Sequence, residues 1–290
     1  MDLGRREQEP MSALLYRGLF DDAALFPPGN APLGQALPAH REHRTGHRAR
    51  YVGPFLVSDA RVAELRTLLD REEGEHEPLE TVVTVPGGAE AVPEAVAAAD
   101  DARLRLVGLE VAAAPGGVGD VTEALARHLP AGASAYVEIS RQGQVPHDLA
   151  ELAGTGHHAK FRTGGVVAQA HPGEAELAAN LHATVGAGAS FKCTAGLHHA
   201  VRHTTPEGFE QHGFLNVLLA TSALLEGATA AEAEAVLAER DGPVLAGAAS
   251  RITGERAEQV RATFHSFGTC SITEPLEDLV VLGALPTTTP

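Results

Sequence analysis

The two lysines of this chain are the residues whose chemistry stands out first. Of the 22 basic residues, only Lys160 and Lys192 are lysine, and the other 20 are arginine. Each lysine lies late in a short strand-like run that ends in glycine, residues 159–165 and 190–196. An amine is more compact than a guanidinium, can lose its proton and can form a Schiff base. We therefore predict that both positions require an amine; the alternative is two ordinary ion-paired lysines.

The neighbours of the lysines extend this chemistry. Successive side chains of a strand point to opposite faces, so Arg162 shares a face with Lys160, and Thr194 shares a face with Lys192. Phe161, between the first pair, suits an outer apolar layer. Charges in a protein interior are costly unless they pair or bind a ligand. We therefore expect the lysines, Arg162 and Thr194 to face an interior site.

The first mechanism that these residues suggest uses a Schiff base. One lysine attacks a substrate carbonyl, and a neighbouring cation lowers its pKa, as Lys160 and Lys192 would do for each other. A carboxylate such as Glu138 or Asp21 would move the protons. The chemistry predicted is that of a lyase of the aldolase type, acting on a small anionic carbonyl compound.

Groups that suit the anionic part of such a substrate lie nearby. Arg162 offers a guanidinium fork, and the turn at Gly164 and Gly165 offers backbone N–H groups. We place His265 at the carboxyl end of the last predicted strand, and Ser266 in the loop after it. Barrel loops at this position commonly bind phosphate. Purely structural turns are the alternative.

Residues 191–196 resemble the Lys-Thr-Ser-Thr-Gly strand of the deoxyribose-phosphate aldolase family, which are class I aldolase barrels. The resemblance implies that Lys192 forms the Schiff base and that Lys160 is the second lysine that tunes it. This chain has Cys193 where the family has threonine, and Ala195 where a small polar residue would complete the pattern. Its second lysine precedes the motif, whereas that of the family follows it.

A second mechanism uses a divalent metal, although no cofactor is required by the first. Asp21 or Asp22, with Glu110 and Glu138, offers the oxygen ligands that Mg²⁺ or Mn²⁺ prefers. A metal-dependent lyase or isomerase would then use a lysine as base. The alternative is that the glutamates only neutralise Lys160, Lys192 and Arg162.

Histidines and one asparagine complete the candidate site. His198 and His199 directly follow the strand of Lys192 and are candidates for acid–base catalysis. His199 and His203 would share one face of a helix, a spacing that can bind zinc. Asn216 is a candidate for orienting the substrate, and the start of a helix is the structural alternative for it.

Eight apolar runs, each followed by a helical pattern, must position these residues. This alternation predicts a (β/α)8 TIM barrel with an extra helical insertion before the last strand. An open doubly wound sheet is the alternative, but it would gather polar residues at one switch point. The eight predicted strands are residues 17–22, 51–58, 81–85, 104–111, 135–140, 158–163, 190–194 and 264–269.

Composition limits the remaining choices. The net charge of −16 argues against nucleic acid and anionic membranes as partners. Two cysteines give no disulfide framework, and no apolar run reaches a membrane span, so a cytoplasmic location is expected. We predict a disordered leader at residues 1–10, one barrel domain at 11–285 and a frayed tail at 286–290. An Ala-rich outer layer of helices would suit a homodimer. A non-catalytic barrel that binds a small acid remains the alternative to an enzyme.

Overall fold

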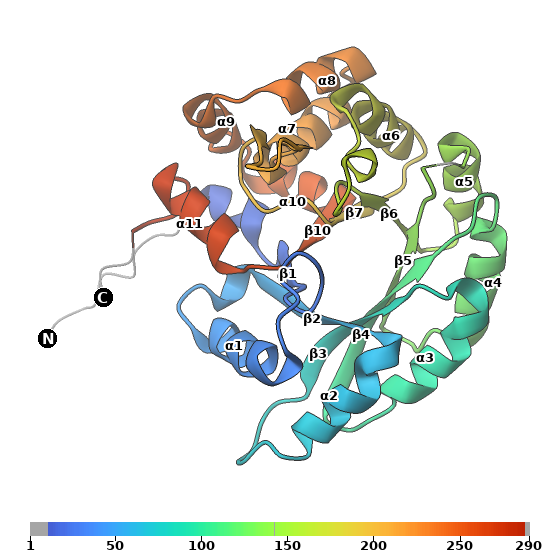
Figure 1. Ribbon diagram of the computed structural model, residues 1–290. Coiled ribbons are helices and arrows are strands. Elements are labelled where there is room, and N and C mark those ends of the chain that lie inside the picture. Colours follow the sequence, from blue (N-terminus) through green and yellow to red (C-terminus); the bar gives the residue numbers. More distant parts are fainter. Residues whose placement is uncertain (1–10, 142, 288–290) are drawn as a thin grey trace, which may run out of the picture.

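The structure is a computed structural model that describes residues 11–141 and 143–287, and it contains a closed barrel of parallel strands (Figure 1). In order around the ring the strands are β1 Phe20–Asp22, β2 Val52–Ser58, β3 Leu79–Val85, β4 Leu104–Ala112, β5 Ser134–Glu138, β6 His158–Arg162, β7 Phe191–Thr194 and β10 Phe264–Thr269. The predicted (β/α)8 barrel is confirmed. The open sheet is wrong, because β1 pairs with both β2 and β10 and closes the ring.

Helices surround the barrel (Figure 1). One α-helix follows each strand: α1 Leu33–Thr45, α2 Val62–Leu69, α3 Val92–Ala99, α4 Val118–His128, α5 Val145–Leu152, α6 Glu174–Gly186, α7 Phe214–Leu225 and α11 Thr273–Val281. Short 3-10 turns lie at η1 Met11–Tyr16, η2 Ala49–Tyr51, η3 Asp59–Arg61, η4 Gly88–Ala91 and η5 Ala168–Ala170. In α2, buried Val62, Leu65 and Leu69 recur at helical spacing and face the barrel.

The predicted helical insertion before the last strand is also confirmed. It consists of a hairpin of β8 His203–Thr204 and β9 Glu210–Gln211, followed beyond α7 by α8 Ala230–Ala238, α9 Gly242–Ala249 and α10 Gly254–Thr263. Helix α7 is apolar and buried almost all round, because α8, α9 and α10 pack against it in addition to the barrel. Neither the hairpin nor α9 was predicted. The glycine and proline that open α9 suggest a loop, but Asp241 caps the helix by accepting from the N–H of Val244.

The interior of the barrel has an apolar side and a charged side. Ala23, Leu56 and Val82 form a small apolar cluster that is separate from the main core, and Val107 packs against it. These residues lie in or next to strands β1 to β4. The opposite side, towards β5, β6 and β7, holds both lysines. The main core instead fills the space between the outer faces of the strands and the helices.

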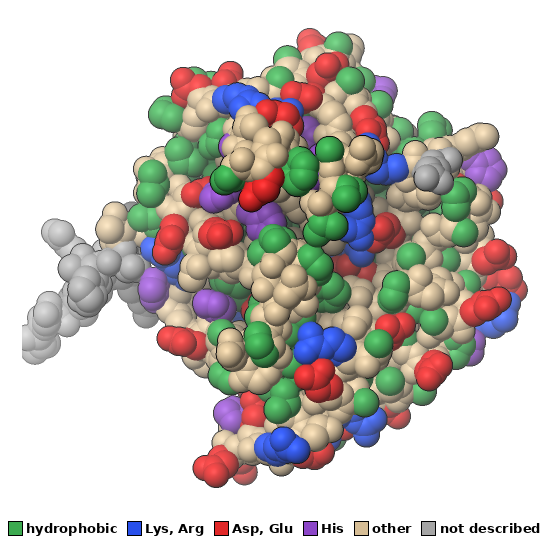
Figure 2. All heavy atoms as spheres, viewed as in Figure 1, with side chains coloured by type: hydrophobic (Ala, Val, Ile, Leu, Met, Phe, Trp, Pro, Cys, Tyr) green, Lys and Arg blue, Asp and Glu red, His purple; other side chains and the backbone are tan. Residues whose placement is uncertain are grey.

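The face of the molecule seen in Figure 2 does not single out one region by charge. Acidic and basic side chains are interspersed over this face. None of the helices in the described ranges combines the length and the apolar character that crossing a membrane requires. The predicted leader, residues 1–10, and residues 288–290 of the predicted tail lie outside the described residues.

Candidate active site

Lys192 is the most deeply buried cation of the barrel, with none of its side chain exposed. Its Nζ lies 2.6 Å from Asp21 Oδ2 and 2.5 Å from Glu110 Oε1. The ring of Tyr136 covers the ammonium at 5.0 Å, and the hydroxyl of Ser266 donates to Asp21 Oδ2 at 2.6 Å. Every group around the amine therefore stabilises its charged form.

Lys160 continues this arrangement towards the carboxyl ends of the strands. Its Nζ lies 2.7 Å from Glu110 Oε2 and 2.9 Å from Glu138 Oε2. Arg162 Nε in turn lies 3.3 Å from Glu138 Oε1. The two oxygens of Glu110 thus join the two lysines. Three acids and three bases alternate without a gap, and their formal charges balance: Asp21, Lys192, Glu110, Lys160, Glu138 and Arg162.

This ion-pair chain sets the pKa values within it. Burial alone would lower the pKa of Lys192, but Asp21 and Glu110 outweigh it and hold that pKa well above 10.5. Burial would raise the pKa of Glu110, yet the two lysines bring it down to about 2. The prediction that a neighbouring lysine lowers the amine pKa is therefore wrong for Lys192, because the shared carboxylate lies between the two cations.

The chain of ion pairs becomes more exposed towards the carboxyl end of the barrel. Exposure of the side chain rises from 6% at Lys160 to 22% at Glu138 and 43% at Arg162. Glu138, Arg162 and Thr194 are the last residues of their strands. Solvent at this mouth therefore reaches Glu138 and Arg162, whereas Lys192 stays closed off behind Lys160.

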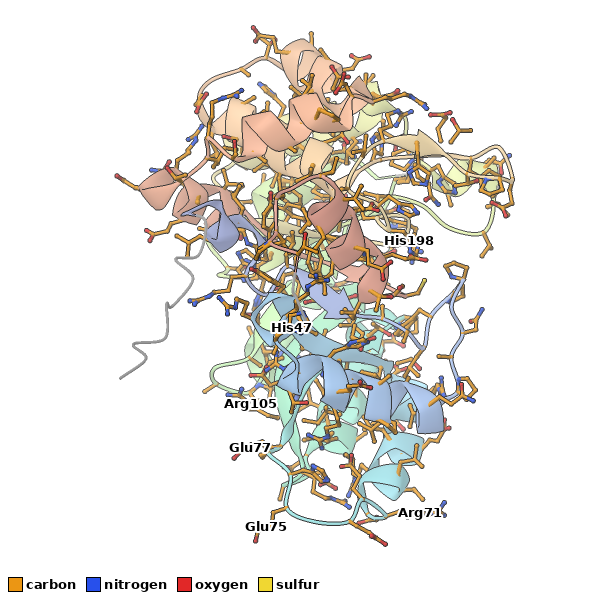
Figure 3. All side chains as sticks on the ribbon, turned by 90° about the vertical axis from the view of Figure 1, so that its left-hand side faces the viewer. His47, Arg71, Glu75, Glu77, Arg105 and His198 are labelled. Carbon is orange, nitrogen blue, oxygen red and sulfur yellow. The ribbon has the colours of Figure 1, made fainter. Side chains whose placement is uncertain are left out.

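A cavity of about 280 Å³ lies at the opposite, amino end of the barrel. Its walls combine apolar and polar side chains, and they are formed by Gly18, Asp21, Pro54, Val82, Val107, Tyr136, Arg261, His265 and Ser266. Figure 3 shows the two ends on opposite sides, with Glu77 and Arg105 from strand starts on the left and His198, which follows β7, on the right. The ion-pair chain therefore spans the interior between the carboxyl mouth and this cavity.

His265 and Ser266 were predicted at the carboxyl mouth, and that placement is wrong. They are the second and third residues of β10, and both line the amino-end cavity. The pairing of β10 with β7 shifts register between Phe264 and Phe267, and this bulge lets two consecutive side chains face inwards. His265 Nδ1 lies 3.2 Å from the hydroxyl of Tyr136.

Gly164 and Gly165 have packing roles that explain their lack of side chains. A Cβ on Gly164 would lie 2.8 Å from the Cα of Gly196, so the loops after β6 and β7 touch through glycine. A Cβ on Gly165 would lie 2.7 Å from that of Ala170. This close approach holds the carboxyl ends of β6 and β7, and hence Arg162, in place.

His198 and His199 lie beside α11 (Figure 3 labels His198). His198 Nδ1 is 3.5 Å from Cys270 Sγ and 3.7 Å from Glu274 Oε2. His199 Nδ1 bonds to Asp278 at 3.1 Å, and this raises its pKa. The segment that carries them is not a helix, so the predicted helical spacing is wrong. The rings of His199 and His203 nevertheless lie 4.7 Å apart between their centroids, and His203 Nδ1 bonds to the carbonyl of Val201.

The prediction that Asn216 orients the substrate is wrong, because this residue is fully buried in the first turn of α7. Its Oδ1 accepts from the N–H of Arg202, and its Nδ2 donates to the carbonyls of Val236 and Glu239. It therefore fastens the insertion to α7. Asp22 likewise turns away from the interior and bonds to His40 on α1 at 2.9 Å.

Tyr136 is a residue of this site that was not predicted. It lies two positions before Glu138 on β5, so strand alternation alone was enough to place it on the inner face. Its ring contacts Lys192 and its hydroxyl contacts His265. An aromatic ring carries no charge that would mark it in the sequence as a member of an ion-paired site.

The three acids predicted as metal ligands are Asp21, Glu110 and Glu138. An ammonium group lies between Asp21 and Glu110, and a second one between Glu110 and Glu138, at 2.5 to 2.9 Å. A cation at either position would have to displace a lysine. The donor set therefore fits the two amines better than it fits a divalent ion.

No protein-family model matches this chain, and no curated protein matches it in sequence. The resemblance of residues 191–196 to an aldolase strand stays a prediction. The chemistry of the site has to be inferred from its own residues and their geometry.

Proposed function

We propose that this barrel is an enzyme of the lyase type that acts on a small anionic carbonyl compound at the carboxyl mouth. The observation that supports this most is the ion-pair chain, whose buried end is fixed and whose exposed end offers an amine, a carboxylate and a guanidinium. These are Lys160, Glu138 and Arg162, joined at 2.9 and 3.3 Å. Charges of this kind are seldom gathered at the ends of barrel strands for stability alone.

Each residue has a distinct role in this proposal. Arg162, the most exposed of the three, binds the anionic group of the substrate. Lys160 is the amine that attacks the carbonyl carbon, because its side chain is 6% exposed whereas that of Lys192 is fully buried. Glu138 takes the proton that Lys160 must lose before it attacks. Lys192, Asp21 and Glu110 hold Lys160 in position.

The proposed reaction proceeds through an imine. The neutral amine of Lys160 adds to the carbonyl, and Glu138 gives the proton it holds to the departing hydroxyl, so that one water leaves and a protonated imine remains. The bond between the α and β carbons of the imine then breaks. Its electron pair moves towards the imine nitrogen, the β-hydroxyl gives its proton to Glu138, and the β fragment leaves as a carbonyl compound. Glu138 returns a proton to the resulting enamine, and water releases the product and the free amine. No external oxidant or reductant is required.

The chain contains only two lysines, which makes a direct test straightforward. The protein is incubated with borohydride and each member of a panel of small oxo acids, and is then cleaved after arginine. Residues 142–162 and 163–202 form separate peptides, each with one lysine. We expect the mass of a reduced adduct on peptide 142–162 only, and its loss in Lys160→Arg.

Other outcomes of this test separate the alternatives. An adduct on peptide 163–202 would make Lys192 the reacting amine and contradict the assignment of roles. Binding of an oxo acid without an adduct or turnover would support a non-catalytic acid-binding barrel. Near-stoichiometric metal, with a lower melting temperature after chelation in wild type but not in Glu138→Gln, would support a metal-dependent enzyme.

The cytoplasm is the setting that we propose for this enzyme. Cys193 and Cys270 are both unpaired thiols, as is usual in a reducing compartment. The thiol of Cys193 is fully buried, and burial raises its pKa, so it has no part in the proposed reaction.

A further inference from the structure

A group of three potential metal ligands lies outside the barrel interior, on α5. His147, Asp148 and Glu151 each offer one ligand atom, and these atoms all lie within 4.8 Å of one another. In the described part of the chain this is the one such group of His, Cys, Asp or Glu. It shares no residue with the ion-pair chain.

Asp148 gives this group its significance. The residue is 1% exposed, and its Oδ1 is a buried atom that makes no hydrogen bond. A buried carboxylate oxygen without a partner is costly, and a missing cation is a common explanation. The nearest potential cation is His147, whose Nδ1 is 4.0 Å from this oxygen.

The backbone around Asp148 fixes it in place. A Cβ on Gly143 would lie 2.6 Å from its other oxygen, Oδ2, so the loop before α5 packs directly against the carboxylate. Glu151 approaches from the opposite side, next to the start of α4, where a Cβ on Gly119 would lie 3.8 Å from Glu151 Oε1. Asp148 is thus the rigid ligand of the group, and Glu151 lies near the neighbouring helix α4.

We propose that His147, Asp148 and Glu151 bind a divalent transition-metal ion, with zinc as the best fit. One imidazole nitrogen with two carboxylate oxygens is a donor set that zinc accepts, whereas calcium and magnesium prefer oxygen alone. His147 and Glu151 are exposed, so water completes the coordination. The exposed side chains of His147 and Glu151 can turn towards the fixed Oδ1 of Asp148, which brings all three ligand atoms close enough to bind one ion.

The site would stabilise α5, because all three of its ligands belong to that helix. Glu138, the proton acceptor in the proposed reaction, is the last residue of β5, and α5 begins at Val145. A bound ion would therefore stabilise the helix that follows the strand of Glu138. This metal is structural, and its binding does not depend on whether the proposed reaction is correct.

Zinc titration of the metal-free full-length protein tests the inference. We expect saturable binding in the micromolar range and a higher melting temperature with zinc. His147→Ala, Asp148→Asn and Glu151→Gln should each remove the same single equivalent, weakening it more than about 100-fold, since even changes outside the ligand shell cost 10- to 100-fold. Calcium should not compete.

Two controls keep the result interpretable, because the chain has 15 histidines that also attract zinc. His182→Ala removes an exposed histidine of α6 and should leave the binding of the one zinc equivalent unchanged. Glu138→Gln should leave it unchanged as well, which separates this site from the ion-pair chain. Equal zinc binding by wild type and His147→Ala, or no saturable binding by wild type, would overturn the proposal.

Discussion

Lys192 Nζ and Glu110 Oε1 lie 2.5 Å apart, although β7 and β4, which carry them, are not neighbours in the barrel. The pair therefore crosses the interior, and it joins two groups that are both almost fully buried. Because each is also paired with a second opposite charge, the arrangement is neutral as a whole. The stability of this arrangement depends on the presence of every charge in it, rather than on any single contact.

The first prediction concerns this balance of charge. Lys192→Met leaves Asp21 and Glu110 buried with one cation fewer, so the free energy of unfolding should fall by about 3–5 kcal/mol. The double variant Lys192→Met with Asp21→Asn removes one charge of each sign and should recover much of that loss. Urea denaturation measures both. A double variant as unstable as the sum of the two single variants would contradict a charge-balanced chain.

The second prediction concerns the contact between two loops. Gly164→Ala places a methyl group 2.8 Å from the Cα of Gly196, which forces the loops after β6 and β7 apart. We expect a loss of about 1–3 kcal/mol in the free energy of unfolding, as for other overpacked sites. In the same loop, Gly173→Ala meets no atom within 4 Å and should change much less. Equal effects of the two substitutions would argue against the close approach.

Much of the fold could be predicted from the sequence because local signals and tertiary structure agree. Helix α4 and strand β10 lie where the apolar pattern placed them, at Val118–His128 and Phe264–Thr269. The inward orientation of Lys160 and Lys192 followed from strand alternation, and both point into the barrel. Their pairing with Glu110 followed from the cost of unpaired buried charge.

The errors have equally specific causes. His265 was placed at the carboxyl end, but a residue one position after the start of β10 lies at the amino end. Asn216 carries no sign in the sequence that the insertion will bury it against Val236 and Glu239, since those contacts span more than 19 residues of chain. The pKa of Lys192 depends on which charged group lies between the two lysines. The spacing of residues along the sequence does not predict that this group is Glu110.

The third prediction concerns acid. His212 is fully buried, its Nε2 lies 2.9 Å from the carbonyl of Pro172, and Arg202 Nη1 lies 3.2 Å from its Nδ1. The neutral ring satisfies both contacts by donating to Pro172 and accepting from Arg202. Burial, and to a lesser extent the nearby charge of Arg202, lowers the pKa of His212 from 6.5 to about 4. The unfolded chain takes up this proton first as the pH falls, so the stabilisation is complete above pH 6.5 and is lost towards pH 4.

The expected size of this effect is at most about 3 kcal/mol. His212→Gln removes the titrating group, so its free energy of unfolding should fall less steeply than that of wild type between pH 6.5 and 4. His182→Gln, at an exposed position of α6, should follow the wild-type profile. Parallel profiles for wild type and His212→Gln would show that His212 does not titrate in this range.

The last prediction compares the two lysines directly. Reductive methylation requires a neutral amine that the reagent can reach, and Lys160 is 6% exposed whereas Lys192 is 0% exposed and has a raised pKa. Cleavage after arginine should therefore give methylated peptide 142–162 well before methylated peptide 163–202. We expect the reagent that does reach Lys192 to enter through the amino-end cavity, because Tyr136 lines that cavity and covers the amine. Val107→Phe, which fills that cavity, should slow methylation of Lys192 and leave that of Lys160 unchanged. Faster methylation of Lys192 than of Lys160 in wild type would reverse the assignment of the reacting amine, because the lysine that the reagent reaches as a neutral amine is the better nucleophile.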